Sequence, residues 1–197
     1  MVRRREIRDS DLLDRLDALS RVKRSLRVWR VIREGRDPCQ CGAPGGRWDD
    51  GTFDVLYTCE SADGAIAEIW FHLTKGQPVF PTKASYRLFE LRLELRSCIV
   101  FPDLEALAKI GVDVSSYGQL SHADRELEYP RMQEIAEHAH FLGADGLCVP
   151  SARWGCANFV VFCDQIEPGK LASEKDHGLV KWDSWGQQNA RQVRISR

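Results

Sequence analysis

The sequence predicts a single α+β domain with added segments at both ends, and three observations support this fold class. Several segments carry apolar residues at the spacing of amphipathic helices. Residues 91–96 alternate strictly between leucine and charged side chains, which indicates a strand with one face on the core. Short apolar runs bounded by turn residues indicate further, buried strands. A chain of 197 residues is long enough for one well-buried core.

The N-terminal part is predicted to form a helix, a strand and a long loop. Ser10 or Asp11 can cap the start of the helix, because both side chains accept backbone N–H groups. Its apolar residues follow helical spacing: Leu12, Leu13, Leu16, Leu19 and Val22. Residues 26–32 then indicate a buried strand. Residues 33–47 contain six glycine or proline residues, so we expect a loop of functional rather than connecting length.

The next elements alternate between strands and helices. Residues 55–60 indicate a strand, and Ser61 caps a helix on which Glu68 lies beside the apolar residues. Gly111 and Gly143 stand where two later helices are expected to end. The remaining predicted elements are the alternating strand, helices at 102–110 and 130–142, and strands at 146–149 and 158–163 on either side of a turn.

Composition and charge exclude several classes of protein. Hydrophobic residues at 43% and charged residues at 29% are ordinary for a soluble protein. No apolar run has the length of a membrane span and the first residues lack the apolar stretch of a signal peptide, so we expect a cytosolic protein without a membrane partner. The net charge of −1 gives no overall basic field for direct nucleic-acid binding. Basic residues at 3–8 and 21–27 are interleaved or followed by acids and predict a solvated helix face.

The cysteines predict neither a disulfide framework nor a complete metal site. Seven of them occur without a repeated spacing, and no secretory signal accompanies them. Cys39 and Cys41 could begin a metal site, but no nearby second pair completes four ligands. Glu68 and His72 are four residues apart and likewise lack a third ligand. Four cysteines lie in apolar, strand-like sequence, where a free thiol behaves as a small hydrophobe: Cys59, Cys98, Cys148 and Cys163.

One short region combines an arginine, a tyrosine and a glutamate. Gly45-Gly46-Arg47-Trp48 sets two glycines before an arginine, so the backbone can approach a ligand closely. Arginine offers a planar fork of donors for a phosphate pair. Tyr57 follows on a strand, and Glu68 is costly to bury on an apolar helix face unless it is used. These residues suggest a site for an anionic ligand at which positive charge develops; the alternative is a tight turn with a structural Arg–Glu pair.

These residues and their order resemble the RES domain, a family of bacterial toxins. Each matching segment is weak alone, and the combination is specific. The segments are Val28-Trp29-Arg30-Val31, Gly45-Gly46-Arg47-Trp48, Leu56-Tyr57 with Glu60-Ser61, Ala65 to Ile69, Gly143-Ala144-Asp145-Gly146 continuing to Val149-Pro150-Ser151-Ala152-Arg153, and Asn158-Phe159-Val160-Val161-Phe162. We therefore divide the chain into an N-terminal helix at 1–25, a RES-like catalytic domain at 26–166 and a C-terminal extension at 167–197 that lacks a strong pattern.

The resemblance implies a mixed, twisted sheet around a cleft, similar to ADP-ribosyltransferases, with helices on the outside. It also implies that NAD is the substrate and that no bound cofactor is needed. Arg30 and Arg47 would bind the pyrophosphate or an incoming phosphate, and Tyr57 would stack on or orient the nicotinamide ring. Glu68 would hold a ribose hydroxyl and favour the oxocarbenium-like state. Ser151 would donate to phosphate or to the nicotinamide amide; alternatively, it satisfies the backbone of its own turn.

Three functional hypotheses follow. The first is a toxin that cleaves the nicotinamide–ribose bond of NAD, with phosphorolysis favoured over hydrolysis and ADP-ribosylation of a host protein as the alternative. The second is the same fold kept as a catalytically silent module that binds an antitoxin. The third is a metal protein that uses Cys39, Cys41 and Cys59. The resemblance also implies an antitoxin that blocks the cleft, and a homodimer, to which the tryptophans at 29, 154, 182 and 185 would contribute interface area.

Overall fold

The computed structural model describes residues 8–74, 85–115, 117–118, 125–189 and 191–193, and it confirms the α+β class. Within these residues, none of the helices has the length and apolar character needed to cross a membrane. The elements in chain order are α1 (Ser10–Asp17), β1 (Arg21–Arg33), β2 (Val55–Cys59), α2 (Ala62–Thr74), β3 (Tyr86–Val100), α3 (Leu104–Lys109), α4 (Arg125–Phe141), β4 (Gly146–Pro150), β5 (Ala157–Phe162), β6 (Leu171–Leu179) and α5 (Trp182–Asn189).

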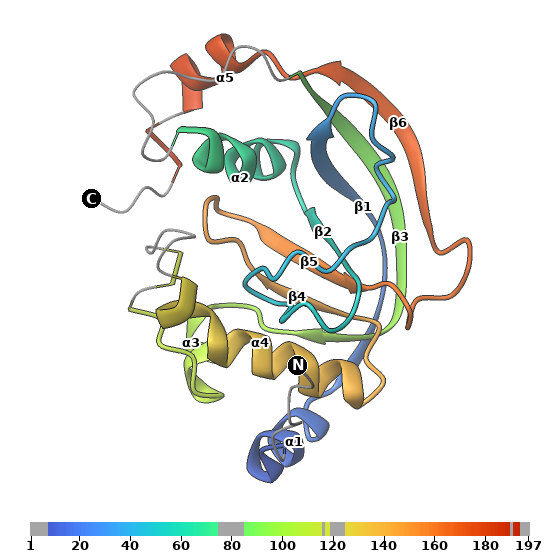
Figure 1. The fold of residues 1–197 in the computed structure, drawn as a ribbon, viewed down its shortest axis with the longest axis vertical. Coiled ribbons are helices and arrows are strands. Elements are labelled where there is room, and N and C mark those ends of the chain that lie inside the picture. The colour runs from blue at the N-terminus through green and yellow to red at the C-terminus, as the bar shows by residue number, and fades with distance from the viewer. Residues whose placement is uncertain (1–7, 75–84, 116, 119–124, 190, 194–197) are drawn as a thin grey trace, which may run out of the picture.

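The strands form one mixed sheet that curves back on itself. Its order is β1-β2-β5-β4-β3-β6, and β1 also pairs with β3, which joins the two sides of the sheet. The β3–β4 pairing is parallel and the other pairings are antiparallel. The β1–β3 ladder runs almost the whole length of both strands, from Arg21 opposite Ile99 to Arg33 opposite Tyr86. Figure 1 shows these two long strands curving together past the shorter strands.

The curved sheet encloses one apolar cluster and is covered on its outer face by two others. Successive side chains of each strand point to opposite faces of the sheet, so each strand contributes to the enclosed cluster and to the outer face. The enclosed cluster lies between the long strands and the β2-β5-β4 strands and includes Val28, Leu56, Leu91, Phe159 and Val161. Helices α1, α3 and α4 cover one part of the outer face, and α2 and α5 cover another (Figure 1). The group of α1, α3 and α4 and the group of α2 and α5 therefore flank β2 and β5 from opposite sides (Figure 1).

Helix α1 is capped one residue before the predicted caps. The side chain of Asp9 accepts the backbone N–H groups of Asp11 and Leu12, so the helix begins at Ser10. Neither Ser10 nor Asp11 is the cap. The helix ends at Asp17 and its buried residues are Leu12 and Leu16, which pack against α4.

Strand β1 begins five residues before the predicted strand. It starts at Arg21 because its pairing with β3 starts there, so Val22 belongs to the strand and not to the helix. The basic residues predicted on a solvated helix face therefore lie on a strand: Arg21, Lys23, Arg24 and Arg27. The basic residues at 3–5 lie outside the described part of the chain. The sequence signal failed because β1 alternates between half-buried and exposed residues at this end.

The last thirty residues contribute more regular structure than the sequence predicts. Strand β6 pairs with β3 at the edge of the sheet, and its central residues are exposed, which explains the absence of an apolar alternation. Helix α5 packs on α2, where Trp182 and Trp185 contact the Trp70 ring. Because Trp29 and Trp154 pack against the same cluster, these four tryptophans provide no argument for a dimer interface.

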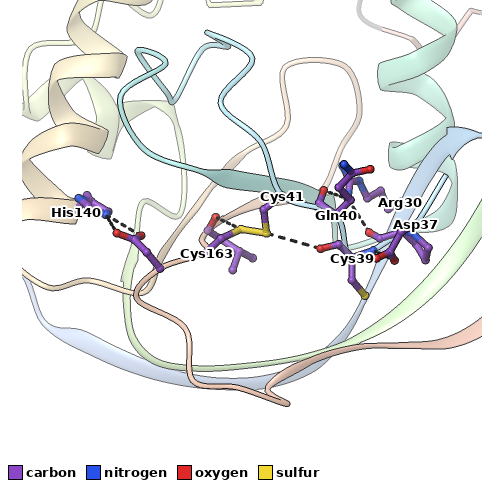
Figure 2. The surroundings of a disulfide bond; sticks show 10 residues. Arg30, Asp37, Cys39, Gln40, Cys41, His140 and Cys163 are labelled. Atoms are coloured by element: carbon purple, nitrogen blue, oxygen red, sulfur yellow. Dashed lines mark hydrogen bonds and ion pairs between the residues drawn. A yellow bond between two sulfur atoms is a disulfide. The ribbon is translucent and has the colours of Figure 1, made fainter.

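A disulfide corrects the prediction that Cys163 is a free, hydrophobe-like thiol. Cys41 and Cys163 are bonded, although 122 positions separate them in the sequence (Figure 2). Gly42 forms a bridge with Val55, and the Cys163 N–H donates to the carbonyl of Asp54, so both cysteines are held beside the start of β2. The bond ties the long loop to the end of β5. Cysteine spacing alone does not reveal this tertiary pairing.

Candidate functional site

A cavity of about 350 Å³ lies where the two helical groups face each other. Strands β1 and β2 form its floor, helix α2 forms one wall, and the segment at 44–48 with two tyrosines forms the other. The predicted residues Arg30, Arg47, Tyr57 and Glu68 all line it, whereas Ser151 does not. Further lining residues that the sequence analysis did not assign a role are Tyr117, Tyr129, Arg153 and Asn158.

The double glycine forms a tight turn around a buried carboxylate. Asp49 is fully buried and accepts the N–H groups of Gly45 and Gly46, at 2.6 and 2.8 Å. Gly45 has a φ of 71°, which favours glycine. A β-carbon on Gly46 would lie 2.7 Å from the Tyr57 hydroxyl. The close approach allowed by glycine is therefore to Tyr57 and Asp49, and it fixes the position of Arg47 at the cavity.

Arg47 is held by an acidic partner that the sequence analysis missed. Its Nε lies 3.0 Å from Oε1 of Glu128 on α4, and the Glu128 side chain is only 1% exposed. The same carboxylate oxygen accepts the N–H of Gly118 at 2.8 Å. The rings of Tyr117 and Tyr129 lie 5.2 and 5.3 Å from the guanidinium, within the range of cation–π attraction. Arg47 is thus fixed in place with its charge largely balanced.

Tyr57 has its hydroxyl fully engaged at the base of the same turn. The hydroxyl donates to Asp49 Oδ2 at 2.8 Å and accepts the N–H of Trp48 at 3.0 Å. Burial, reinforced by the Asp49 carboxylate, raises the pKa of Tyr57 well above its usual value of 10. The phenol therefore stays protonated and acts as a donor to Asp49, so the part of Tyr57 available to a ligand is its ring.

Glu68 is oriented by two neutral donors. Ser151 Oγ donates to Glu68 Oε1 at 3.1 Å, and Asn158 Nδ2 donates to the same oxygen at 2.9 Å. Among the described residues, Glu68 forms no direct ion pair, but its charge opposes the effect of burial on the pKa of both Arg47 and Arg153, so these two guanidinium groups lie close enough to offset part of it. Ser151 is fully buried and also accepts the N–H groups of Arg153 and Trp154. Its hydroxyl thus serves both the carboxylate and its own turn.

Arg153 is a second buried cation beside the cavity. Its side chain lies over the ring of Phe71, with the guanidinium carbon 3.3 Å from the ring centre, and its Nη1 donates to the carbonyl of Gly118. Burial lowers the pKa of Arg153 to about 10, so it still carries a positive charge at neutral pH. Within the described parts of the chain no carboxylate forms an ion pair with it, and its buried Nε has no hydrogen-bond partner.

Arg30 has its guanidinium committed to the long loop. Nη1 donates to the carbonyls of Pro38 and Gln40 at 2.6 and 3.1 Å, and Figure 2 shows the side chain lying against this loop. On β1 it alternates with Trp29 and Val31, which pack toward α2. The structure therefore brings Arg47, Tyr57 and Glu68 together around the cavity, while Arg30 supports the loop at its edge.

The hypothetical metal ligands do not converge. Cys41 is used by the disulfide, and Cys59 lies 3.2 Å from Cys156, sulfur to sulfur. His72 is exposed on α2 at the cavity, one turn after Glu68. Across residues 8–74, 85–115 and the later described ranges, no group of three cysteine, histidine or acidic side chains is placed to hold a metal ion.

The arrangement suits an extended ligand with anionic and ring-shaped parts. A planar donor fork and aromatic rings stand on one wall, a carboxylate without a salt bridge among the described residues stands on the other, and the volume is that of a small-molecule site. A negative charge held by neutral donors stabilises positive charge that develops next to it. The geometry is therefore suited to binding a ligand that carries an anionic group and to stabilising a positive charge beside Glu68.

Comparisons with known proteins identify the family and the fold. The family model of the RES domain matches residues 27–183, which confirms the predicted resemblance and extends it through β6. A chain in the crystal structure of the M. tuberculosis MbcT–MbcA toxin–antitoxin complex superposes with a TM-score of 0.73 and 22% sequence identity, over 92% of this chain and 98% of that chain. At this identity the likeness concerns the fold. No curated protein matches the sequence.

Proposed function

Because the chain belongs to the RES domain family, we propose that it is the toxin of a toxin–antitoxin pair and degrades NAD by cleaving its nicotinamide–ribose bond. The observation that carries the proposal is the cavity in which Glu68, held by Ser151 and Asn158, faces the Arg47 wall. NAD has the required parts: an anionic pyrophosphate, a planar ring, and a ribose at which positive charge develops.

The chemistry needs little from the protein beyond positioning and charge. Cleavage of the bond passes through an oxocarbenium-like state, as in glycoside hydrolysis. Nicotinamide leaves as a neutral molecule, so no general acid is required. Glu68 would accept a ribose hydroxyl and stabilise the cationic ribose through Oε2, since Ser151 and Asn158 occupy Oε1. Tyr57 would contact the nicotinamide ring by its own ring, since its hydroxyl is engaged.

We favour inorganic phosphate as the acceptor, which would give nicotinamide and ADP-ribose phosphate. Three arginines line the cavity, and of these Arg153 is neither ion-paired among the described residues nor committed to the long loop, as Arg47 and Arg30 respectively are. Arg153 would thus take the anion-binding role that the resemblance implied for Arg30. Water, or a side chain of a host protein in an ADP-ribosyl transfer, are the alternative acceptors. The ADP-ribosyltransferase-like character of the fold belongs to this proposal.

The proposal includes a cytosolic location and an antitoxin that blocks the cavity. The similar fold in the MbcT–MbcA complex supports a protein partner of this type. The homodimer belongs to the proposal as well, and it rests on family resemblance alone, because the tryptophans pack internally. A mass measurement in solution tests it: a particle of 22.4 kDa at micromolar concentration would contradict the dimer.

Product analysis tests the activity directly. Purified protein is incubated with NAD with and without phosphate, and the products are separated and identified. We expect ADP-ribose phosphate only in the incubation with phosphate. Nicotinamide should appear in both incubations if water can also act as the acceptor. Glu68→Gln is the matched control, because it keeps the size and a hydrogen-bond acceptor but loses the charge. If wild-type protein leaves NAD intact and is harmless when expressed alone, the hypothesis of a catalytically silent module replaces the toxin hypothesis.

A further inference from the structure

Two free thiols meet at the end of the cavity floor. Cys59 is the last residue of β2, and Cys156 precedes β5, the strand that pairs with β2. Their sulfur atoms lie 3.2 Å apart, and no bond joins them. Helix α2 passes over the pair at Gly64, where a β-carbon would overlap both sulfurs. Because Gly64 has no side chain, both sulfur atoms fit beneath α2 at this point.

The two thiols have complementary chemical properties. Cys59 is 2% exposed and lines the cavity, whereas Cys156 is partly exposed on the turn. A hydrogen bond from Cys59, assisted by Ser61, lowers the pKa of the Cys156 thiol. The same hydrogen bond, together with burial, raises the pKa of Cys59. Cys156 is the more exposed of the two and the one whose pKa is lowered, so we expect it to ionise first, with Cys59 as the neighbouring thiol 3.2 Å away.

The other free cysteines lack this combination. Burial raises the pKa of Cys98 to about 12 and that of Cys148 to about 11. Burial, with the Asp37 carboxylate, also raises the pKa of Cys39, which is partly exposed like Cys156. A thiol that is both accessible and readily ionised is found at Cys156 alone among the five free cysteines of the described chain.

We propose that Cys59 and Cys156 are a reversible oxidation site that takes a hydroperoxide as its oxidant. With a hydroperoxide, the Cys156 thiolate attacks the O–O bond, becomes a sulfenic acid and releases water or an alcohol. Cys59 then attacks that sulfur, its proton leaves with the hydroxide as water, and the disulfide forms. In total the two thiols lose two electrons and two protons. The peroxide takes up these electrons and protons and becomes two molecules of water, or one of water and one of alcohol. A dithiol reductant reverses the reaction.

Formation of this bond would alter the turn that holds Glu68. A disulfide is about 2.05 Å long, so the sulfurs must approach each other by about 1 Å. The carbonyl of Cys156 accepts the N–H of Ser151 at 2.8 Å, and Ser151 in turn orients Glu68. The shift is therefore transmitted to the carboxylate through two hydrogen bonds. This consequence rests on the proposed function, whereas the oxidation site itself does not.

Peptide mapping tests the site without reference to activity. The protein is treated with one equivalent of hydrogen peroxide, remaining thiols are alkylated, and cross-linked peptides are identified. Trypsin leaves Cys156 and Cys163 on one fragment, residues 154–170, so a second cut with chymotrypsin after Phe159 or Phe162 is required. We expect a Cys59–Cys156 link that a reductant removes, and faster labelling of Cys156 than of Cys39 by a limiting thiol reagent.

Two variants complete the test. Cys156→Ser should abolish the link and leave Cys59 free, and Cys39→Ser should leave the link unchanged. Wild-type protein whose Cys59 and Cys156 are both alkylated in full after peroxide overturns the proposal, as does Cys156 oxidised without a link to Cys59. NAD breakdown is then compared before and after oxidation within each variant. We expect a reversible fall of at least tenfold in wild type and little change in Cys156→Ser. A mapped link without any activity in either state would refute the proposed function and leave the oxidation site standing.

Discussion

The two walls of the cavity hold their charged residues by different means. On the α4 wall, Arg47 is paired with Glu128, whose side chain is 1% exposed, and lies between two tyrosine rings. On the α2 wall, Glu68 is held by the neutral donors Ser151 and Asn158. Arg47 has a direct carboxylate partner before any ligand enters, whereas Glu68 interacts with Arg47 and Arg153 without a salt bridge among the described residues.

This difference separates two contributions to a site. A balanced, stacked arginine still offers its planar fork of donors, so the α4 wall contributes shape and orientation. A carboxylate held by neutral donors and without a direct ion pair contributes electrostatic stabilisation of a cation. We therefore expect substitutions on the α4 wall to affect folding first, and substitutions on the α2 wall to affect turnover with little effect on folding.

The largest predicted effect is on stability and comes from Arg47→Ala. Removing one member of a buried ion pair leaves the other charge without a partner, at a cost of about 3–5 kcal/mol. Glu128 would be left in this state, since its side chain is almost wholly buried. Urea unfolding should show the loss as a lower transition midpoint with an unchanged slope.

Arg47→Lys is the matched control for this prediction. Lysine keeps a positive charge near Glu128 but loses the fork, so stability should largely return while NAD turnover stays low. Arg47→Ala protein that unfolds at the wild-type midpoint would show that the α4 wall is not built on this pair. Full activity in Arg47→Lys would show that a point charge suffices.

The next largest effect is on turnover and comes from Glu68→Gln. Loss of a group that stabilises charge in the transition state lowers turnover about 10²–10³-fold. Glutamine retains an oxygen for Ser151 and Asn158, so the unfolding midpoint should stay near that of wild type. Initial rates of nicotinamide release measure the effect. Near-normal rates in the variant would remove Glu68 from the mechanism, and a large drop in stability would erase the contrast between the walls.

Most of the fold could be predicted because local patterns and tertiary structure agree. The alternation at 91–96, the cap at Ser61 and the apolar runs all lie in elements of the predicted type. The predictions failed where pairing with a distant strand decides the structure. Strand β6 is exposed and polar, so only its pairing with β3 makes it a strand, and β1 extends to Arg21 for the same reason.

The site was predicted unevenly for a similar reason. Arg47, Tyr57 and Glu68 were identified because each is an unusual residue beside glycine or apolar sequence. Their partners are not local: Glu128 is 81 positions from Arg47, and Asn158 is 90 positions from Glu68. No spacing rule connects such pairs, and Glu128 precedes a predicted helix without any marker. Asn158 carries one local signal, since it is a polar residue at the start of an otherwise apolar strand.

A smaller effect is expected from the two residues that orient Glu68. Ser151→Ala and Asn158→Ala each remove one hydrogen bond to Oε1, and the loss of about 1.4 kcal/mol of orientation would lower turnover about tenfold. The Michaelis constant for NAD should change less than turnover, because the charge remains. Thermal unfolding of each variant shows whether the lower turnover reflects a misplaced Glu68 or a loss of folded protein.

Asn158→Asp distinguishes an orienting role from simple packing. A second carboxylate beside Glu68 repels its negative charge, so ionisation of the pair is disfavoured in the variant. The low-pH limb of its activity profile should therefore move to higher pH. A profile that falls uniformly without such a shift would mean that Asn158 acts only through packing.

The smallest effect concerns Tyr57, whose contribution to stability is present at neutral pH and is lost at alkaline pH. Tyr57→Phe removes the hydrogen bonds to Asp49 and from Trp48, at a cost of about 1 kcal/mol near neutral pH. Burial raises the pKa of Tyr57 above 10 in the folded protein, so the folded state keeps a proton that the unfolded state loses. The stability from Tyr57 is therefore complete below about pH 10 and is lost as pH rises toward the folded-state pKa, by about 1.4 kcal/mol per pH unit. Urea unfolding at a series of pH values should show the wild-type advantage over Tyr57→Phe shrinking above about pH 10. A constant difference across that range would mean that the phenol is not kept neutral by the Asp49 turn.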